Sequence, residues 1–333
     1  MSTLKAFTDQ QDADAGVVTE SRTVHAVTGA FGYSGRYIAD VLLAKGCEVR
    51  TLTNSLGRAG ALAGKIVAHP FNFHSPSMLV DSLRDVKVLY NTYWTRFNYK
   101  RFNHAEAVAH TLLLFECALK AGVERIVHVS ITNPSLDSEL EYFRGKALLE
   151  RALMRSGIPY AILRPTVLFG REDILVNNIA WFLRHLPVFG LFGQGGYRLQ
   201  PIFVGDLAKL AVEYGETNAN VVVEAIGPET FSFKELVKVI ARALGKKRLL
   251  VPMPPSLAYQ CTRLAGWALR DVVVTEEEIA GLMEERLFVD APPAGHTRFT
   301  EWVGANASWL GMRYTSELGR RVDRTKEYTR NHS

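Results

Sequence analysis

One short segment constrains the fold of this chain more than any other, the glycine-spaced run TGAFGYSG at residues 28–35. It lies between a run of β-forming residues and a stretch with helical periodicity. Gly29 allows a tight turn, Gly32 lets the backbone approach a ligand closely, and Gly35 lets the helix pack against the strand. Because the unpaired amides at the start of the helix face this turn, the segment predicts a site for the pyrophosphate of a dinucleotide.

The chain continues as an alternation of short β-rich runs with longer helical stretches. The expected strands are 23–28, 48–53, 65–69, 86–91, 125–130, 160–163 and 221–225. The expected helices are 33–45, 77–83, 104–121 and 139–155. Since connections between parallel strands are right-handed, this order predicts an α/β fold with a doubly wound parallel sheet, a Rossmann fold. Its ligand site should lie at the carboxyl ends of the strands.

The regularity weakens after Pro165, which indicates a division of the chain into parts. We expect a flexible tail at residues 1–22, a dinucleotide-binding core at 23–170 and a smaller C-terminal substrate cap at 171–333. Within that cap, residues 200–226 are expected to return to the sheet. Two capping boxes, Ser232 with Glu235 and Thr275 with Glu278, predict helix starts inside the cap.

Charge and composition exclude several classes of protein. Lysine and arginine number 39 against 34 aspartates and glutamates, and this net charge of +5, slightly concentrated after Arg313, is too small to predict nucleic-acid binding. Cys47, Cys117 and Cys261 are far apart and the histidines form no zinc motif, so we expect a reducing compartment and no metal. Without a signal-peptide pattern or a transmembrane segment, we expect a cytoplasmic protein, with peripheral membrane attachment as the alternative.

Residues after the second and third expected strands bear on the choice of nicotinamide cofactor. An NAD-specific site usually carries an acidic residue for the ribose 2′-hydroxyl, but this chain has Asn54 there, followed by Arg58. A guanidinium can pair with a 2′-phosphate that no carboxylate repels, so NADP is preferred over NAD. An exposed loop arginine is the competing interpretation of Arg58. Asn72 is a candidate adenine contact, whereas Phe71 and Phe73 are expected in the core.

A tyrosine and a lysine four residues apart, Tyr142 and Lys146, follow the fifth expected strand. On a helix these positions share a face, so the ammonium would lower the phenol pKa and also reach the nicotinamide ribose. Tyr142 would then exchange a proton with a substrate hydroxyl or carbonyl as a hydride moves. Ser130 and Thr132 end the preceding strand and could orient the substrate oxygen, with Thr132 preferred; capping of the strand end is the alternative.

Together these features resemble the extended and atypical short-chain dehydrogenase/reductases, from residue 23 to about residue 285. The motifs are TGAFGYSG, the Ser/Thr strand end, YFRGK, ILRPTVLFG and PIFVGDLA around Asp206. The runs NTYWTRF and LFGREDILVNN are most similar to the NmrA-like branch and to the accessory NAD(P)H-binding subunit of respiratory complex I. The resemblance implies that residues 165–167 lie against the nicotinamide carboxamide and that Lys146 holds its ribose.

Two functions remain open. The main prediction is an NAD(P)-dependent oxidoreductase, a reductase, dehydrogenase or epimerase-like enzyme, acting on a small carbonyl or hydroxyl substrate. The alternative is a non-catalytic module that binds NAD(P)H and passes a signal or stability to a partner, either a second copy of the chain or a respiratory-complex-like assembly. Tyr142 with Lys146 favours the enzyme, whereas the bulky Tyr93 and Trp94 after the fourth strand favour the module.

The complete set of expected contacts follows from these arguments. Expected cofactor contacts are Gly29, Phe31, Gly32, Tyr33, Gly35, Asn54, Arg58, Asn72, Thr92, Lys146, Pro165, Thr166 and Val167. Expected substrate contacts are Tyr93, Arg96 and Arg171; surface salt bridges are the alternative for the two arginines. The apolar run SLAYQCTRLAGWAL at 256–269 fits a cap helix over the substrate better than a dimer face or an interfacial membrane helix.

Overall fold

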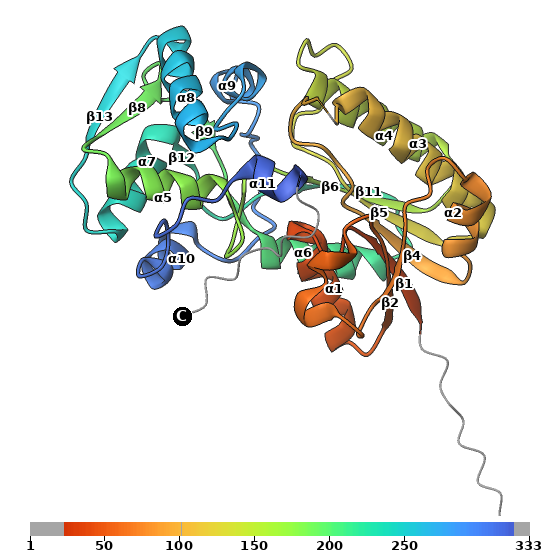
Figure 1. The fold of residues 1–333 in the computed structure, drawn as a ribbon. Helices are drawn as coiled ribbons and strands as arrows, with labels where there is room; N and C mark the ends of the chain where they lie inside the picture. Colours follow the sequence, from red (N-terminus) through yellow and green to blue (C-terminus); the bar gives the residue numbers. More distant parts are fainter. Residues whose placement is uncertain (1–22, 101, 323–333) are drawn as a thin grey trace, which may run out of the picture.

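The computed structural model describes residues 23–100 and 102–322, which form two lobes side by side (Figure 1). The first lobe is built on a seven-stranded sheet in the order β11-β6-β5-β4-β1-β2-β3, in which every pair is parallel. Its strands are β1 (Val24–Thr28), β2 (Glu48–Leu52), β3 (Val67–His69), β4 (Val86–Asn91), β5 (Arg125–Val129), β6 (Tyr160–Pro165) and β11 (Val221–Ala225). The doubly wound parallel sheet is confirmed, and its order reverses between β1 and β4, where such sheets bind ligands.

Helices cover both faces of this sheet. On one face α1 (Tyr33–Ala44) packs against α6 (Val204–Gly215). The helices on the other face are α2 (Pro76–Ser82), α3 (His104–Ala121) and α4 (Glu141–Arg155). Ala26 and Val27 are successive residues of β1, and each is buried in a different one of these two layers. This is why apolar residues occur at successive positions of β1 and do not strictly alternate with polar ones.

The second lobe is built from the C-terminal half around its own apolar core. Its helices are α5 (Leu175–His185), α7 (Phe233–Ala243), α8 (Pro255–Leu269), α9 (Glu276–Met283) and α10 (Phe299–Asn306). Its strands are β8 (Val188–Phe192) with β13 (Leu249–Met253), and β9 (Arg198–Leu199) with β12 (Phe231–Ser232); β7 (Leu168–Phe169) pairs β10 (Ile202–Phe203). Both expected capping boxes form, at the starts of α7 and α9.

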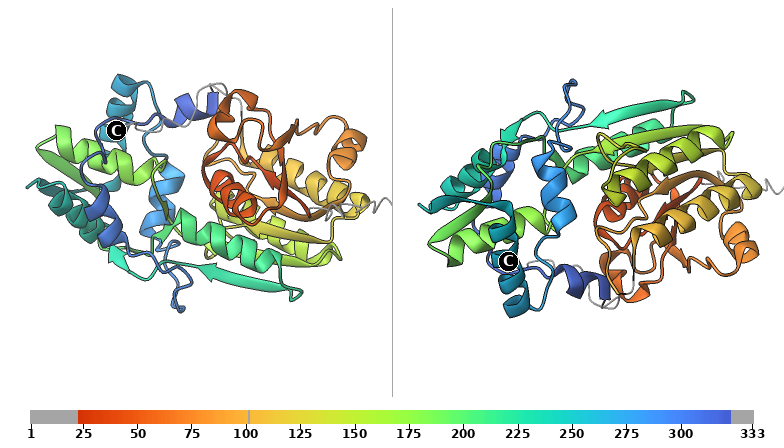
Figure 2. Two further views of the ribbon diagram at one scale, coloured as in Figure 1. Left: turned by 90° about the horizontal axis from the view of Figure 1, so that it is seen from below. Right: turned by 90° about the horizontal axis from the view of Figure 1, so that it is seen from above.

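The last described helix, α11 (Glu317–Val322), lies between the two lobes in Figure 1, and Figure 2 shows it reaching the sheet lobe. It is anchored in the second lobe, because the Asp271 carboxylate accepts the amides of Glu317 at 2.9 Å and Leu318 at 2.8 Å. The end of the described chain is therefore held over the crevice of the sheet. No helix in the described ranges is long and apolar enough to cross a membrane.

The predicted organisation of the chain agrees with the structure only in part. The tail expected over residues 1–22 lies outside the described residues. The expected strand 65–69 begins only at Val67, because a 3₁₀ helix at Gly60–Leu62 and the turn after it occupy the residues before it. The domain boundary at residue 170 and the role of the second lobe as a substrate cap stay predictions.

Candidate functional site

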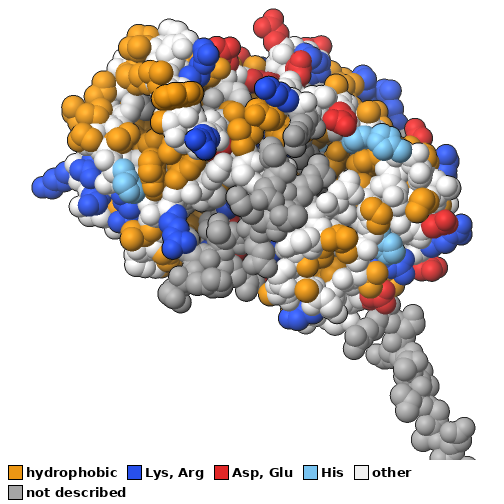
Figure 3. All heavy atoms as spheres, viewed as in Figure 1, with side chains coloured by type: hydrophobic (Ala, Val, Ile, Leu, Met, Phe, Trp, Pro, Cys, Tyr) orange, Lys and Arg blue, Asp and Glu red, His pale blue; other side chains and the backbone are white. Residues whose placement is uncertain are grey.

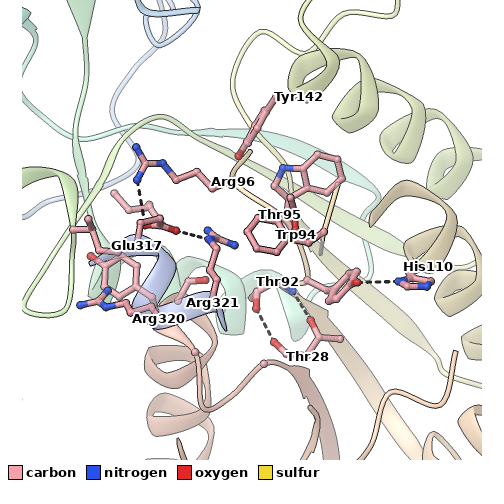
Figure 4. A pocket seen from close by; sticks show the side chains of 18 of the residues that line it. Thr28, Thr92, Trp94, Thr95, Arg96, His110, Tyr142, Glu317, Arg320 and Arg321 are labelled. Atoms are coloured by element: carbon pink, nitrogen blue, oxygen red, sulfur yellow. Dashed lines mark hydrogen bonds and ion pairs between the residues drawn. The ribbon is translucent and has the colours of Figure 1, made fainter. Parts of the chain in front are cut away.

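A cavity of about 930 Å³ lies at the carboxyl ends of the sheet strands and is lined on its other side by residues of α9 and α11; Figure 4 shows the α11 side chains there. Of the contacts predicted from the sequence, those that line it are Gly29, Phe31, Gly32, Tyr33, Asn54, Arg58, Asn72, Thr92, Tyr93, Arg96, Tyr142, Thr166 and Val167. The predicted residues that do not line it are Gly35, Ser130, Thr132, Lys146, Pro165 and Arg171.

The turn between β1 and α1 has the geometry that a bound pyrophosphate needs. Gly29 has a φ of +66°, and its carbonyl accepts the amide of Gly32 at 2.7 Å. Gly32 is the N-cap of α1 and has no side chain to cap the helix, so the first amides of the helix are left for a ligand. A Cβ on Gly35 would lie 2.8 Å from the carbonyl carbon of Gly29 and closer still to its oxygen. Gly35 therefore acts beneath the turn, by letting α1 pack against β1, and not as a wall of the cavity.

Threonine side chains fix the wall between β1 and β4. The Thr28 hydroxyl accepts the amide of Thr92 at 2.7 Å and donates to the side chain of Asn91 at 3.0 Å. In return the Thr92 hydroxyl donates to the carbonyl of Thr28 at 2.6 Å. These bonds lock the ends of the two central strands together at the point where the sheet order reverses.

The loops after β2 and β3 form one end of the cavity. The side-chain oxygen of Asn54 accepts the amide of Phe71 at 3.1 Å, which ties the two loops together. Arg58 is only 7% exposed, so it is not the exposed loop arginine that was the competing interpretation. Asn72 lines the cavity with a φ of +49°, a conformation that asparagine tolerates better than most residues.

An aromatic group lies beside this end and includes Tyr93. Phe71 is buried in the core as expected, but both Phe71 and Phe73 line the cavity, and Phe73 stacks on His110 with ring centroids 4.0 Å apart. The Tyr93 hydroxyl bonds to Nδ1 of His110 at 2.9 Å (Figure 4). Tyr93 is therefore directed toward α3, and it does not fill the end of the cavity near Tyr142.

The segment after β5 presents a different residue to the cavity from the one expected. Ile131 lines the cavity, whereas its neighbours Ser130 and Thr132 do not and are 3% and 0% exposed. The Thr132 hydroxyl instead donates to a carboxylate oxygen of Glu224 at 2.6 Å. The prediction that one of these hydroxyls orients a substrate is wrong for this structure, because successive side chains of an extended segment face opposite sides.

The tyrosine and lysine of the YxxxK pair are separated by Trp94. Lys146 is 2% exposed, donates to the carbonyl of Val129 at 2.8 Å, and lies 4.4 Å from the centroid of the Trp94 ring. Tyr142 packs edge-on against the same ring, with centroids 5.5 Å apart. The two residues do share α4 as expected, but an indole from the end of β4 covers the lysine.

The pKa values of this pair differ from the expectation. Burial raises the pKa of Tyr142 to about 12, and the strongest opposing charge is Arg321 on α11 rather than Lys146. Burial also lowers the pKa of Lys146 to about 7, which the carboxylate of Glu150 only partly offsets. The prediction that Lys146 lowers the phenol pKa is therefore wrong for this structure, and Tyr142 is a neutral phenol at pH 7.

Arg96 joins the two lobes at the cavity. Its Nε bonds to Glu278 on α9, and its Nη1 donates to Glu317 on α11 at 3.1 Å. Arg321 also pairs with Glu317 (Figure 4). Burial alone would raise the pKa of Glu317, but the two guanidinium groups hold it at about 2. Arg96, expected to bind an acidic substrate group, is thus already paired with two carboxylates of its own chain.

Arg171, the other expected substrate contact, lies outside the cavity and is placed 5.9 Å from the centroid of the Trp309 ring. Sequence reasoning also missed several charged residues that do line the cavity: Asp173, Glu277, Glu278, Glu317, Arg320 and Arg321. Only weak signals were available for them, namely the capping box at Thr275 and the slight basic excess after Arg313. Neither signal shows that these segments fold back onto the sheet.

Comparisons with known proteins place the chain among nicotinamide-related sequences. The profile described as "NAD dependent epimerase/dehydratase family" matches residues 25–134. The "NADH-ubiquinone oxidoreductase 40 kDa subunit, mitochondrial" of Neurospora crassa is 29% identical over 263 residues, covering 76% of this chain and 68% of that protein. The "NADH dehydrogenase (ubiquinone) 1 alpha subcomplex subunit 9, mitochondrial" of Rattus norvegicus is 28% identical over 282 residues, covering 76% and 71%.

Among solved structures, the triphenylmethane reductase of Citrobacter sp. complexed with NADP(H) has the same fold. Its TM-score is 0.71 at 18% identity, over 86% of this chain and 99% of that one. The resemblance drawn from the sequence is confirmed: part of the chain matches the NAD dependent epimerase/dehydratase profile, and most of it is similar to these subunits of NADH-ubiquinone oxidoreductases.

Proposed function

We propose that the protein binds a nicotinamide adenine dinucleotide in this cavity and acts as an NAD(P)-dependent oxidoreductase on a small carbonyl or hydroxyl compound. The observation that carries the proposal is one continuous cavity that runs from the uncapped start of α1 at Gly32 to the phenol of Tyr142. The uncapped amides suit a pyrophosphate. Triphenylmethane reductase, which shares the fold, was solved in complex with NADP(H), and this supports a nicotinamide cofactor.

We further propose that the cofactor is NADP. Arg58 lines the cavity beside Asn54, and its carbonyl accepts Nη2 of Arg36 at 3.1 Å, which fixes the backbone that carries it. A guanidinium held there can form a charged hydrogen bond with a 2′-phosphate. The nicotinamide end would then lie against Thr166 and Val167, as the family resemblance implies.

The bound dinucleotide would supply a hydride to the carbonyl carbon of the substrate. The carbonyl oxygen must then gain a proton, and the Tyr142 phenol can donate one, because its pKa of about 12 keeps it protonated at neutral pH. Ile131 and Val167 give this end of the cavity apolar walls. The arrangement therefore favours reduction of a carbonyl over oxidation of an alcohol, which would need a base at this position.

The position of Trp94 favours a second candidate, a non-catalytic module that binds NAD(P)H within a larger assembly. Lys146 is covered by the Trp94 ring and cannot reach a nicotinamide ribose unless that ring moves. A Cβ on Gly145 would lie 2.9 Å from the same ring, so the indole is closely packed on α4. The mitochondrial relatives are named as subunits of a multi-protein complex, which agrees with this candidate.

The cofactor assignment is tested by calorimetric titration of NADPH and NADH into wild type, Arg58→Ala and, as a control, the exposed Arg151→Ala. A charged hydrogen bond is worth about 1.5–3 kcal/mol, so wild type should prefer NADPH by about tenfold or more. Arg58→Ala should remove that preference and Arg151→Ala should keep it. Equal affinities in wild type that neither substitution changes would refute the assignment.

Catalysis is tested by NADPH consumption with a panel of aldehydes, ketones and quinones. Tyr142→Phe should keep NADPH affinity and lower turnover by about 100-fold, the scale of a positioned proton donor. Tyr160→Phe, at the far end of β6, is the matched control and should behave as wild type. NADPH binding without turnover on any compound, in wild type and in Trp94→Ala alike, would favour the non-catalytic module.

A further inference from the structure

The helix α8 carries an apolar stripe on the face that points to solvent. Trp267, Leu264 and Leu257 are 83%, 70% and 52% exposed. Together with Cys261 and Ala268 they recur at helical spacing, so they share one side of the helix. The buried residues of α8 are two small ones, Ala258 and Gly266. The stripe is therefore not used to pack this helix onto its own lobe.

This stripe belongs to a wider apolar surface of the second lobe. Leu249 on β13 is 64% exposed, Leu186 before β8 is 46% exposed, and Val188 on β8 is 42% exposed. Figure 3 shows hydrophobic side chains gathered over the part of the molecule where α8, β8 and β13 lie. Exposed apolar patches of this kind usually mark a surface that meets a partner or a membrane.

The sequence interpretation of this segment as a cap over the substrate is not supported. No residue of α8 lines the cavity, as far as the described chain shows. The helix lies on the outside of the second lobe, and its outward residues have no counterpart within the described part of the protein. The stripe therefore needs an occupant other than the substrate.

The charged residues of α8, of its C-terminal end and of the segment before β13 are of one sign. α8 contains no aspartate or glutamate, and Arg263 and Arg270 are exposed beside its apolar face. Lys246 and Lys247 come just before β13, which carries the exposed Leu249. Apolar residues bordered by cations are the arrangement of helices that lie in the surface of an anionic bilayer. Tryptophan is also enriched at that boundary.

We propose that this surface, formed by α8 and the outer edge of β8 and β13, docks the protein on an anionic lipid bilayer. Trp267, Leu264 and Leu257 enter the boundary between headgroups and acyl chains, and the arginines beside them pair with lipid phosphates. A symmetric contact with a second copy would bring α8 against α8, where no carboxylate of that helix meets the arginines. The proposal goes beyond the proposed function and does not depend on it.

The test is flotation of the whole protein with vesicles of phosphatidylcholine alone and of an equimolar mixture with phosphatidylglycerol. Wild type should float with the mixed vesicles and at least about tenfold less with the neutral ones, and raising the salt should weaken binding. Of the five tryptophans, Trp267 is the exposed one, so the emission of wild type should shift to the blue on mixed vesicles and that of Trp267→Phe should not.

Leu264→Glu should lower the vesicle-bound fraction about tenfold, because it places a carboxylate in the centre of the stripe. Leu119→Glu is the matched control, since Leu119 is 54% exposed on α3 in the other lobe, and it should bind as wild type. Both variants should keep the melting temperature and the NADPH affinity of wild type, which separates this test from that of the proposed function.

The proposal is overturned if wild type floats with neither kind of vesicle, or if Leu264→Glu floats as wild type does. Light scattering supplies a further outcome. Wild type could dimerise without binding vesicles while Leu264→Glu stays monomeric. That result would show that a second copy covers the stripe, and it would overturn the proposal as well.

Discussion

A methyl group at residue 35 should disturb both the stability of the protein and its ligand site. A Cβ there would lie 2.8 Å from the carbonyl carbon of Gly29 and 3.1 Å from the carbonyl oxygen of Thr28. Both obstacles are backbone atoms, so no side chain can rotate out of the way, and α1 must move outward against α6. Overpacking of this kind costs about 1–3 kcal/mol, and we expect Gly35→Ala to lose that much free energy of unfolding.

The same shift displaces the amides that begin α1 from the ligand. A displacement of about 1 Å is enough to lose charged hydrogen bonds, so NADPH affinity should fall about tenfold or more. Gly304→Ala is the control, because a Cβ there, in the last turn of α10, meets nothing within 4 Å and should stabilise that helix slightly. Urea unfolding and calorimetry measure both effects. A Gly35→Ala protein as stable as wild type, with unchanged NADPH affinity, would refute the reasoning.

The remaining predictions concern charges. Arg96→Met leaves Glu278 and Glu317 without the cation they share, so the free energy of unfolding measured in urea should fall by about 3 kcal/mol. Adding Glu317→Gln should recover part of that loss. Equal stability of wild type and Arg96→Met would show that the lobes are not joined there. Burial lowers the pKa of His25 to about 4, so this residue binds a proton in the unfolded chain first and should contribute a loss of about 2 kcal/mol in the free energy of unfolding as the pH falls from about 6.5 to 4. His25→Gln should remove this contribution, leaving that of the other buried histidines such as His128, whereas His74→Gln, at an exposed histidine, should not; identical pH curves for wild type and His25→Gln would contradict the assignment.

The fold and the phosphate turn could be predicted from the sequence because their signals are local. Buried parallel strands carry apolar residues on both faces, so β1 and β4 stand out as short segments rich in β-forming residues, and the turn at Gly29 to Gly35 has its three glycines within one short segment. Such signals do not depend on which distant segments pack nearby.

The far side of the cavity could not be predicted, because it is assembled from segments distant in sequence. Arg96 meets Glu317, a residue 221 positions away, and neither has a local pattern that names the other. The spacing of Tyr142 and Lys146 was right, but the indole of Trp94 comes between them from the loop after β4. Which of Ser130 and Ile131 faces the cavity depends on the phase of one extended segment, and sequence reasoning did not fix that phase.

The most direct test of the account is calorimetric titration of NADPH into wild type, Gly32→Asp and Gly304→Asp. Gly32 begins α1 with extended backbone dihedrals that aspartate can adopt, so Gly32→Asp should fold normally. Its carboxylate would lie where we place the pyrophosphate, and we predict that binding is lost. Gly304→Asp, on the exposed side of α10, should bind as wild type. Unchanged NADPH affinity in a folded Gly32→Asp protein would contradict the central claim that this turn holds a dinucleotide.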